Sequence, residues 1–313
     1  MSAWVSRHFG LEKVAEGVYA AIATEHGGAM GNAGFVDLGD RVVIFDTFNA
    51  PQAAQDLKEA AVHFTGHDRF ILVNSHWHGD HIRGNQAFDA KEIYASPITR
   101  EWIEREHPGR IERQQSMLPQ LALDIAELEG KLAALHGEET QAERITLHQQ
   151  VSFLREMQEA LPQLRLVPPT HSVEHEQVLT GSARSIRLVT CGAGHSPSDL
   201  VMEVPDCGIL FAGDLVSIDN HPMLDGGDPW NWVNILEMLE SNGYTTVIPG
   251  HGPVGAADSI SVQRQYLKTL IDLASRISEE ESMPEPYMAW KADFLYKPNL
   301  AYIRAKAAQS VQQ

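Results

Sequence analysis

Three histidines and one aspartate fall within a span of six residues, at His76, His78, Asp80 and His81. Imidazole and carboxylate groups are good ligands for zinc and for similar divalent metals. In an extended chain His76 and His78 point to the same side, so both can bind one ion. Asp80 and His81 lie on the turn that follows and can reach a second ion. The spacing therefore predicts a metal site with room for two cations.

Three later segments share one order, an apolar strand followed by a ligand-type residue in a glycine-rich turn. They contribute His195, Asp214 and His251. Each segment is weak alone, because a histidine after a strand is usually an ordinary loop residue. The glycines let the backbone approach an ion closely. Together with the first motif, these segments predict one site assembled from four strand ends.

Apolar runs bounded by turn residues predict the strands that must position these ligands. In the first part of the chain we expect strands at 18–23, 34–38, 41–46 and 70–73 and a helix at 51–64. In the second part we expect strands at 186–189, 200–204, 208–212 and 245–248 and helices at 230–241 and 259–280. The turns at 39–40 and 205–206 indicate two hairpins. Strands alternating with helices imply sheets that are covered by helices.

Between these two parts lies a segment with two apolar stripes, which we place at residues 110–162 as an inserted helical hairpin. The first stripe consists of Leu118, Leu121, Ile125, Leu128, Leu132 and Leu135, and residues 136–139 break it. The second consists of Leu147, Val151, Leu154, Met157, Leu161 and Leu164. Spacings of three and four residues are typical of packed helices. We expect the two stripes to pack together, with a dimer arm and a lid over the site as alternatives.

Composition limits the class of protein. The chain has 313 residues, of which 43% are hydrophobic and 21% charged, as in an ordinary globular protein. We expect a single domain over 1–313 that contains the insertion. No apolar run approaches the roughly 20 residues that cross a bilayer, so we expect no membrane span. The net charge of −18 repels phosphate backbones, so a small-molecule substrate is expected and nucleic acid is not.

The cysteines and the first residues bear on the cellular compartment. Cys191 and Cys207 are too few for a disulfide framework, which favours a reducing environment. The first residues show no basic stretch followed by an apolar one, as a secretory signal would. We therefore expect a cytoplasmic location.

The motif at 76–81, taken with His195, Asp214 and His251, resembles the metallo-β-lactamase superfamily. The resemblance covers residues from about 17 to 256, apart from the insertion. It implies an α/β fold, the αββα sandwich, in which the metal site lies at one edge of two sheets. An aspartate at position 214 looks like glyoxalase II and lactonases, because the zinc β-lactamases usually have cysteine or serine there.

The resemblance also implies a role for each ligand. The first metal would be held by His76, His78 and His195, the second by Asp80, His81 and His251, and Asp214 would bridge them. Both ions would be zinc (Zn²⁺), with iron or manganese as alternatives. Two such ions, about 3.5–4 Å apart, convert a bridging water into hydroxide near neutral pH. Asp80 would act as a catalytic residue by orienting that hydroxide.

Four further residues are candidates for the surroundings of the metals. Asp46 ends a strand where the family often has an aspartate that supports a metal-bound histidine, although a turn cap is an equal alternative. Met30 lies in the loop 26–32, which resembles the family's mobile flap, and would contact substrate. His221 and Trp230 follow Asp214 and should line the mouth of the site. His221 would stabilise charge as a catalytic group or be an ordinary loop histidine.

These features predict a dinuclear zinc hydrolase for a small carbonyl substrate, namely an ester, lactone, thioester or β-lactam. One alternative is a mononuclear iron persulfide-type dioxygenase that uses two histidines and one aspartate, matching His78, His195 and Asp214. Another is a non-catalytic metal-binding sensor or interaction protein that uses the helical hairpin for partners, including a second copy in a homodimer. The presence of all seven ligands favours two metals.

Overall fold

The structure is a computed structural model that describes residues 4–136, 140–276 and 282–310. Within these ranges the chain forms two β-sheets. The first has the order β1-β2-β3-β4-β5-β6-β7, with β1 (Phe9–Ala15), β2 (Val18–Ala23), β3 (Ala33–Asp37), β4 (Val42–Phe45), β5 (Phe70–Val73), β6 (Glu92–Ala95) and β7 (His171–Ser172). The second has the order β13-β12-β11-β10-β9-β8, with β8 (Glu176–Thr180), β9 (Ser185–Gly192), β10 (Asp199–Val204), β11 (Ile209–Ser217), β12 (Thr246–His251) and β13 (Gly255–Ala256).

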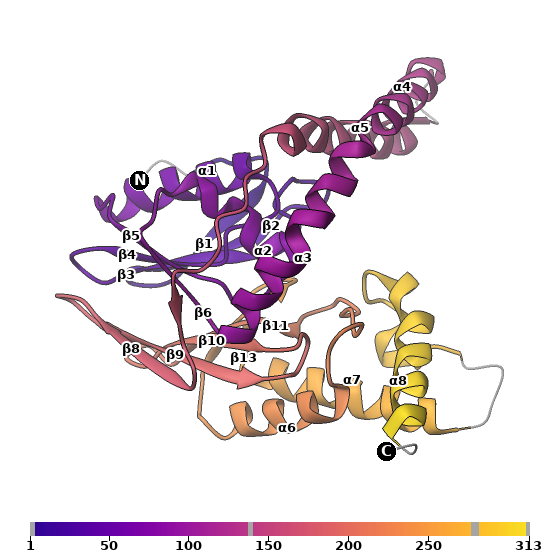
Figure 1. The fold of residues 1–313 in the computed structure, drawn as a ribbon. Coiled ribbons are helices and arrows are strands. Elements are labelled where there is room, and N and C mark those ends of the chain that lie inside the picture. Colours follow the sequence, from indigo (N-terminus) through magenta and orange to yellow (C-terminus); the bar gives the residue numbers. More distant parts are fainter. Residues whose placement is uncertain (1–3, 137–139, 277–281, 311–313) are drawn as a thin grey trace.

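Helices surround and extend the two sheets (Figure 1). The α-helices are α1 (Pro51–Thr65), α2 (Gly79–Ile82), α3 (Pro97–Ser116), α4 (Leu118–Ala134), α5 (Gln141–Ala160), α6 (Pro229–Glu240), α7 (Asp258–Ser275) and α8 (Tyr296–Ser310). Short 3₁₀ helices are η1 (Arg83–Ala87), η3 (Leu161–Gln163), η4 (Glu285–Tyr287) and η5 (Asp293–Leu295). None of the helices in the described ranges is long and apolar enough to cross a membrane.

The two sheets face each other across an apolar core, which confirms the expected αββα sandwich. Side chains of both sheets form this core, and the rings of Phe45 and Phe211 lie 5.5 Å apart across it. A second cluster, which includes Leu57, fills the space between the first sheet and α1. A third, which includes Trp232 and Leu267, lies between the second sheet and α6, α7 and α8. Figure 1 shows the resulting layers.

Strand pairing follows the turns in the sequence. β3 and β4 pair antiparallel around 39–40, and β10 and β11 pair antiparallel around 205–206, so both expected hairpins are confirmed. β4 and β5 pair parallel, with α1 as the crossover between them. Strands β1 and β8 were not expected. Both are edge strands with a single buried residue each, so they carry little of the apolar pattern that reveals a buried strand.

The helical insertion is present, but its helices begin before residue 110. α3 starts at Pro97, where the Ser96 side chain accepts a hydrogen bond from the Thr99 backbone amide and caps the helix. The side chains that α3 buries are Thr99, Ile103, His107 and Ile111. Two of these four are polar, so the buried face does not read as an apolar stripe. The expected single domain over 1–313 stays a prediction.

α4 and α5 pack side by side and extend away from the sheets (Figure 1). Ile125 and Val151, one from each stripe, are buried, whereas most other stripe residues are partly exposed. Most of the expected break between the stripes, 137–139, lies outside the described residues, as do 277–280 of the expected helix 259–280. Pairing within one chain accounts for the stripes only in part, and the homodimer stays a prediction.

Candidate metal centre

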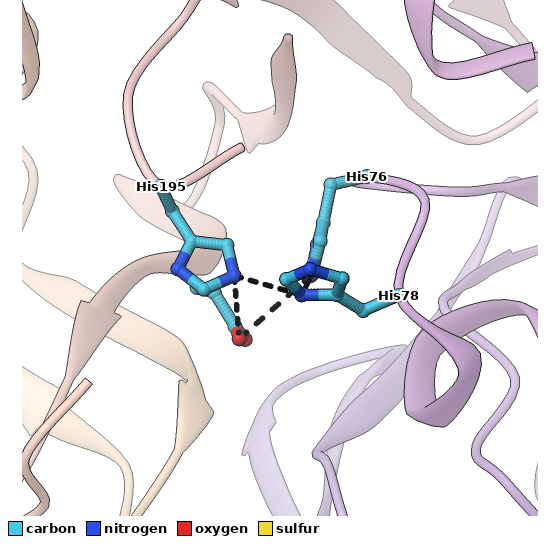
Figure 2. A group of neighbouring side chains, drawn as sticks. His76, His78 and His195 are labelled. Atoms are coloured by element: carbon cyan, nitrogen blue, oxygen red, sulfur yellow. Dashed lines mark hydrogen bonds and ion pairs between the residues drawn. The ribbon is translucent and has the colours of Figure 1, made fainter. Parts of the chain in front are cut away.

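The first group of ligand-type side chains combines three separate chain segments. His76 and His78 follow β5, His195 follows β9, and Asp214 lies in β11. His78 Nδ1 lies 3.0 Å from both His76 Nε2 and His195 Nε2. Asp214 Oδ2 lies 3.2 Å from His195 Nε2. Figure 2 shows the three imidazoles converging on one point.

The second group consists of Asp80, His81 and His251. Asp80 Oδ2 lies 3.6 Å from His81 Nε2 and 3.5 Å from His251 Nε2. Asp214 stands between the two groups, because its Oδ1 lies 3.1 Å from His81 Nε2 and its Oδ2 lies 3.3 Å from His251 Nε2. The structure thus brings together all seven residues, divided as the resemblance implies.

The geometry of these groups fits metal ions. Two ligand atoms on a tetrahedral zinc ion, each about 2.0–2.1 Å from the metal, lie about 3.3 Å from each other. The measured distances are similar, at 3.0 Å between neighbouring ring nitrogens and 3.1–3.3 Å between ring nitrogens and the Asp214 carboxylate oxygens. His81 Nε2 and Asp214 Oδ1 are buried and face each other at 3.1 Å, but neither forms a well-aligned hydrogen bond among the described residues. Such groups are costly to bury unless something binds them. The two His/Asp groups can therefore bind metal ions.

The fold brings these groups together because their segments leave the strands at one edge of the sandwich. The single turn of α2 presents Asp80 and His81 right after the extended segment with His76 and His78. Close backbone approach is also required. A Cβ atom at Gly250 would lie 1.9 Å from Asp214 Oδ1, so only glycine fits there.

Asp46 and Ser75 orient two of the imidazoles. Asp46 Oδ2 lies 2.9 Å from His81 Nδ1, and Asp46 also accepts hydrogen bonds from the backbone amide and hydroxyl of Ser75. The Ser75 hydroxyl in turn lies 2.9 Å from His76 Nδ1. Because Nδ1 of His81 is engaged by a carboxylate, Nε2 is free to bind a cation. The turn cap that was the other expectation for Asp46 is compatible with these same bonds.

Burial and charge set the protonation states of the cluster. Burial alone lowers the pKa of His81, but Asp214, Asp80 and Asp46 together raise it well above its usual value. Burial raises the pKa of Asp214, but neighbouring histidines, His251 foremost, outweigh this and hold it well below its usual range. Asp214 therefore stays charged. A metal that binds to His81 must displace its proton, so metal affinity depends on pH.

His76 and His78 behave differently from His81. Burial lowers the pKa of His78 to about 3, and burial likewise lowers the pKa of His76 well below its usual value. Both imidazoles are therefore neutral at neutral pH. A neutral imidazole offers a nitrogen lone pair without having to lose a proton, which is the form that binds metals.

The loop 26–32 lies against the site as expected. Gly31 packs directly on His81, since a Cβ there would lie 2.9 Å from the imidazole ring. The Asn32 side chain donates hydrogen bonds to the carbonyls of Pro249 and Gly252, which tie the loop to the turn that carries His251. Met30 is 48% exposed and lines the metal-site cavity. Asn32 was missed by sequence reasoning.

The two residues expected at the mouth of the site, His221 and Trp230, differ in their positions. Trp230 lines a different cavity, together with Val233 and Lys268, so its expected place at the metal site is wrong. The Asp228 side chain caps α6 by accepting hydrogen bonds from the backbone amides of Trp230 and Asn231. His221 does line the metal-site cavity. However, its Nδ1 lies 2.8 Å from the Tyr266 hydroxyl and its Nε2 lies 3.2 Å from the Tyr287 carbonyl, which supports a structural role.

Two supporting residues were missed by sequence reasoning. Trp232 is fully buried, its ring centroid lies 5.5 Å from that of His195, and its Nε1 donates to the Leu215 carbonyl. Asp199 accepts hydrogen bonds from the backbone amides of Gly194 and Ser196, on either side of His195, and burial raises its pKa to about 7. An aspartate in a glycine-serine turn was the available signal.

The cavity above the ligands has a volume of about 440 Å³. That is in the range of small-molecule sites. Its floor includes His78, Asp80, His195, Asp214 and His251. The segment around η5 contributes further wall residues, Ala292, Phe294 and Leu295, which no local pattern in the sequence predicted.

The two-sheet sandwich with a buried His/Asp cluster at its edge defines a class of protein, and sequence comparison agrees with it. Residues 26–251 match the family described as the metallo-beta-lactamase superfamily, and the chain belongs to that superfamily.

Solved structures support the same fold. A metallo-beta-lactamase from Pontibacter korlensis has a TM-score of 0.59 and 16% identity, over 83% of this chain and 99% of that protein. A metallo-beta-lactamase from Erythrobacter litoralis, with beta mercaptoethanol in the active site, has a TM-score of 0.58 and 15% identity, over 85% of this chain and 98% of that protein. At this level of identity the likeness concerns the fold alone.

Proposed function

We propose that this protein is a hydrolase that binds two zinc ions and cleaves a small carbonyl substrate, namely an ester, lactone, thioester or β-lactam. The observation that carries the proposal is the position of Asp214, whose two carboxylate oxygens lie within 3.3 Å of ring nitrogens from both ligand groups. One carboxylate placed in this way can hold two cations close together.

The residues of the chain have separable tasks in this proposal. His76, His78 and His195 would hold one ion, while Asp80, His81 and His251 would hold the other. When bound, two such ions polarise a carbonyl oxygen and supply a water-derived nucleophile near neutral pH. Asp80 lines the cavity, so its carboxylate is placed to orient that nucleophile toward a substrate. Asp46 and Ser75 keep two imidazoles in the orientation that binding requires.

The donor set favours two metals over one. A mononuclear iron oxygenase would use His78, His195 and Asp214 and would leave Asp80, His81 and His251 without a task. The intact ligand set also disfavours a non-catalytic sensor or interaction protein, because these buried carboxylates and imidazoles are costly to keep without a metal. A small-molecule substrate fits the cavity of about 440 Å³, and the net charge of −18 disfavours nucleic acid.

The first experiment measures the metal content of protein purified without chelators, by elemental mass spectrometry. Two zinc ions per chain support the proposal, and lactones, thioesters and β-lactams are then screened as substrates. One iron per chain instead supports the oxygenase, which oxygen uptake would test. No metal, even after reconstitution, would overturn the proposal. Because a structurally similar protein holds β-mercaptoethanol in its active site, small thiols are suitable probes of metal occupancy.

A further inference from the structure

Two arginines lie in the wall of the cavity that the metal-ligand cluster floors. Arg83 belongs to η1 and Arg110 to α3, and both line the cavity together with His78, Asp80 and Asp214. The two side chains come from different parts of the chain. Arg83 follows the histidine motif by two residues, whereas Arg110 is brought in by the insertion.

The contacts of both guanidinium groups are to neutral partners. Arg83 donates from Nη1 to Asn49 Oδ1 at 3.0 Å and from Nη2 to Gln114 Oε1 at 2.7 Å, while its buried Nε lacks a hydrogen-bond partner among the described residues. The guanidinium carbon of Arg110 lies 4.3 Å from the centre of the Trp77 ring. These contacts fix the two groups in place without neutralising them.

The position of Arg110 is set by the docking of α3. His107, one turn earlier on the helix, is buried and donates from Nε2 to the Trp77 carbonyl at 2.6 Å. α3 is therefore held against the segment that carries His76 and His78. The insertion thus places a cation at the cavity and does more than extend away from the body.

The charge balance makes this pair unusual. The chain has 42 acidic and 24 basic residues, yet two arginine side chains line this one cavity. The carboxylate that attracts Arg83 is Asp80, which would share its charge with a metal ion under the proposed function. An anion in the cavity would therefore meet two guanidinium groups.

The wall around η5 and after β11 has the opposite character. It presents Met223, Phe294 and Leu295 to the cavity, and Phe294 is 73% exposed. A ligand in this cavity therefore meets a metal-binding floor, a cationic wall and an apolar wall. A substrate that fits all three environments has a group that binds metal, an anionic group and an apolar group.

We propose that Arg83 and Arg110 form a subsite for a carboxylate group of the substrate. This inference rests on the proposed hydrolase function, since it places the carboxylate beside a carbonyl held over the metal-ligand cluster. A guanidinium group offers a planar fork of donors that matches the two oxygens of a carboxylate. The apolar part of the substrate then lies against Phe294 and Leu295. The substrate is therefore a small carboxylic acid that carries a hydrolysable ester, lactone, thioester or lactam.

The test uses two probes of equal length, 3-mercaptopropanoate and 3-mercaptopropanol. Both thiols can bind zinc through sulfur, and they differ in the carboxylate alone. Calorimetric titration of the zinc-loaded protein gives the affinity for each probe, and the ratio of the two affinities is the readout. In the wild-type protein the acid binds more tightly than the alcohol. Raising the ionic strength weakens this preference, because salt screens the charges.

Two variants change the arginines of the cationic wall, and one serves as the control. Arg110→Gln lowers the preference for the acid by about tenfold, the effect expected for one charged hydrogen bond. Arg83→Lys keeps the charge but removes the fork and lowers the preference as well. Arg113→Gln, at an exposed position of α3 outside the cavity lining, leaves the ratio unchanged. The affinity for the alcohol stays constant in all four proteins, which shows that fold and metal loading are intact.

The possible failures are distinguishable. If the alcohol binds every protein equally and the ratio in Arg110→Gln and Arg83→Lys equals that of the wild type, the carboxylate subsite is wrong and the hydrolase proposal stands. If zinc does not load, or neither thiol binds the zinc-loaded wild-type protein, the hydrolase proposal is wrong and the subsite that rests on it falls with it.

Discussion

The floor and the walls of the metal-site cavity are built in different ways. Every ligand-type residue of the floor lies in a strand or in the short turn after one, and these segments belong to the two packed sheets. The walls come from α3 in the insertion and from the segment around η5 near the C-terminus. Under the proposed function, the metal ligands lie on the two packed sheets, whereas two wall residues that would select the substrate, Arg110 and Phe294, lie on added segments.

The metal-ligand cluster is also more deeply buried than the helical insertion. His76, His81 and His195 are almost fully buried. Most stripe residues of α4 and α5 remain partly exposed, with Ile125 and Val151 as the buried exceptions. Regions with few buried apolar contacts open at a lower free-energy cost. The helical insertion is therefore expected to loosen before the metal centre does.

The largest effect is expected at the residue between the two ligand groups. Asp214→Ala removes the carboxylate within reach of both groups, so we expect loss of one metal and a fall in turnover of more than about a hundredfold, since changes to supporting residues alone cost 10–100-fold. Elemental analysis and turnover with the best substrate from the screen check this. Asp68→Ala, at an exposed position, is the control. Unchanged turnover in Asp214→Ala would contradict the bridging role.

The sequence predicts the floor of the cavity better than its walls. The motif at 76–81 and the turns with His195, Asp214 and His251 are local signals, each attached to its own strand, and the structure brings all of them together. The misplacement of Trp230 arose because the face of a helix that meets the site depends on how the whole helix docks. Arg110 and Phe294 reach the cavity through the packing of distant segments, which no local pattern encodes.

The second-largest effect is expected from the packing behind the metal ligands. It is tested with two tryptophans of α6, Trp232 and Trp230. Trp232→Ala leaves a cavity against His195, so we expect a loss of about 3–5 kcal/mol in the free energy of unfolding. Trp230, which is 37% exposed, is the matched control, and Trp230→Ala should cost less than about 1 kcal/mol. Urea denaturation of both variants gives the two values. Equal losses would contradict the different places of these residues.

A smaller effect is expected one step away from the ligands. Asp46→Asn keeps the size of the side chain but removes the carboxylate that accepts a hydrogen bond from His81 Nδ1. We expect a loss of about 10–100-fold in the affinity for one metal, the range typical of such supporting residues. Competition with a chromophoric chelator measures the affinity. Loss of both metals, or of neither, would show that Asp46 does not act through His81.

The smallest effect concerns the attachment of the insertion to the body. Glu156 of α5 is buried, with its Oε2 3.3 Å from Arg7 Nη2 and its Oε1 3.2 Å from His8 Nδ1. Burial raises the pKa of Glu156, and the opposing influence of Arg7 does not cancel this. The folded state therefore holds the proton more tightly than the unfolded state does. The contribution of Glu156 to stability falls as the pH rises from its ordinary pKa of 4.5 through the raised folded pKa.

Glu156→Gln removes this titration, so the stability of the variant relative to the wild type should increase as the pH rises through that window. Urea denaturation of both proteins at pH 4 and pH 7 measures the change. Glu143→Gln, at an exposed position on the same helix, should run parallel to the wild type. Metal affinity at neutral pH should be the same in all three proteins, because Glu156 belongs to the attachment of the insertion and not to the floor. If Glu156→Gln instead changes metal affinity as strongly as Asp46→Asn does, the two regions are coupled and the separation of chemistry from selection does not hold.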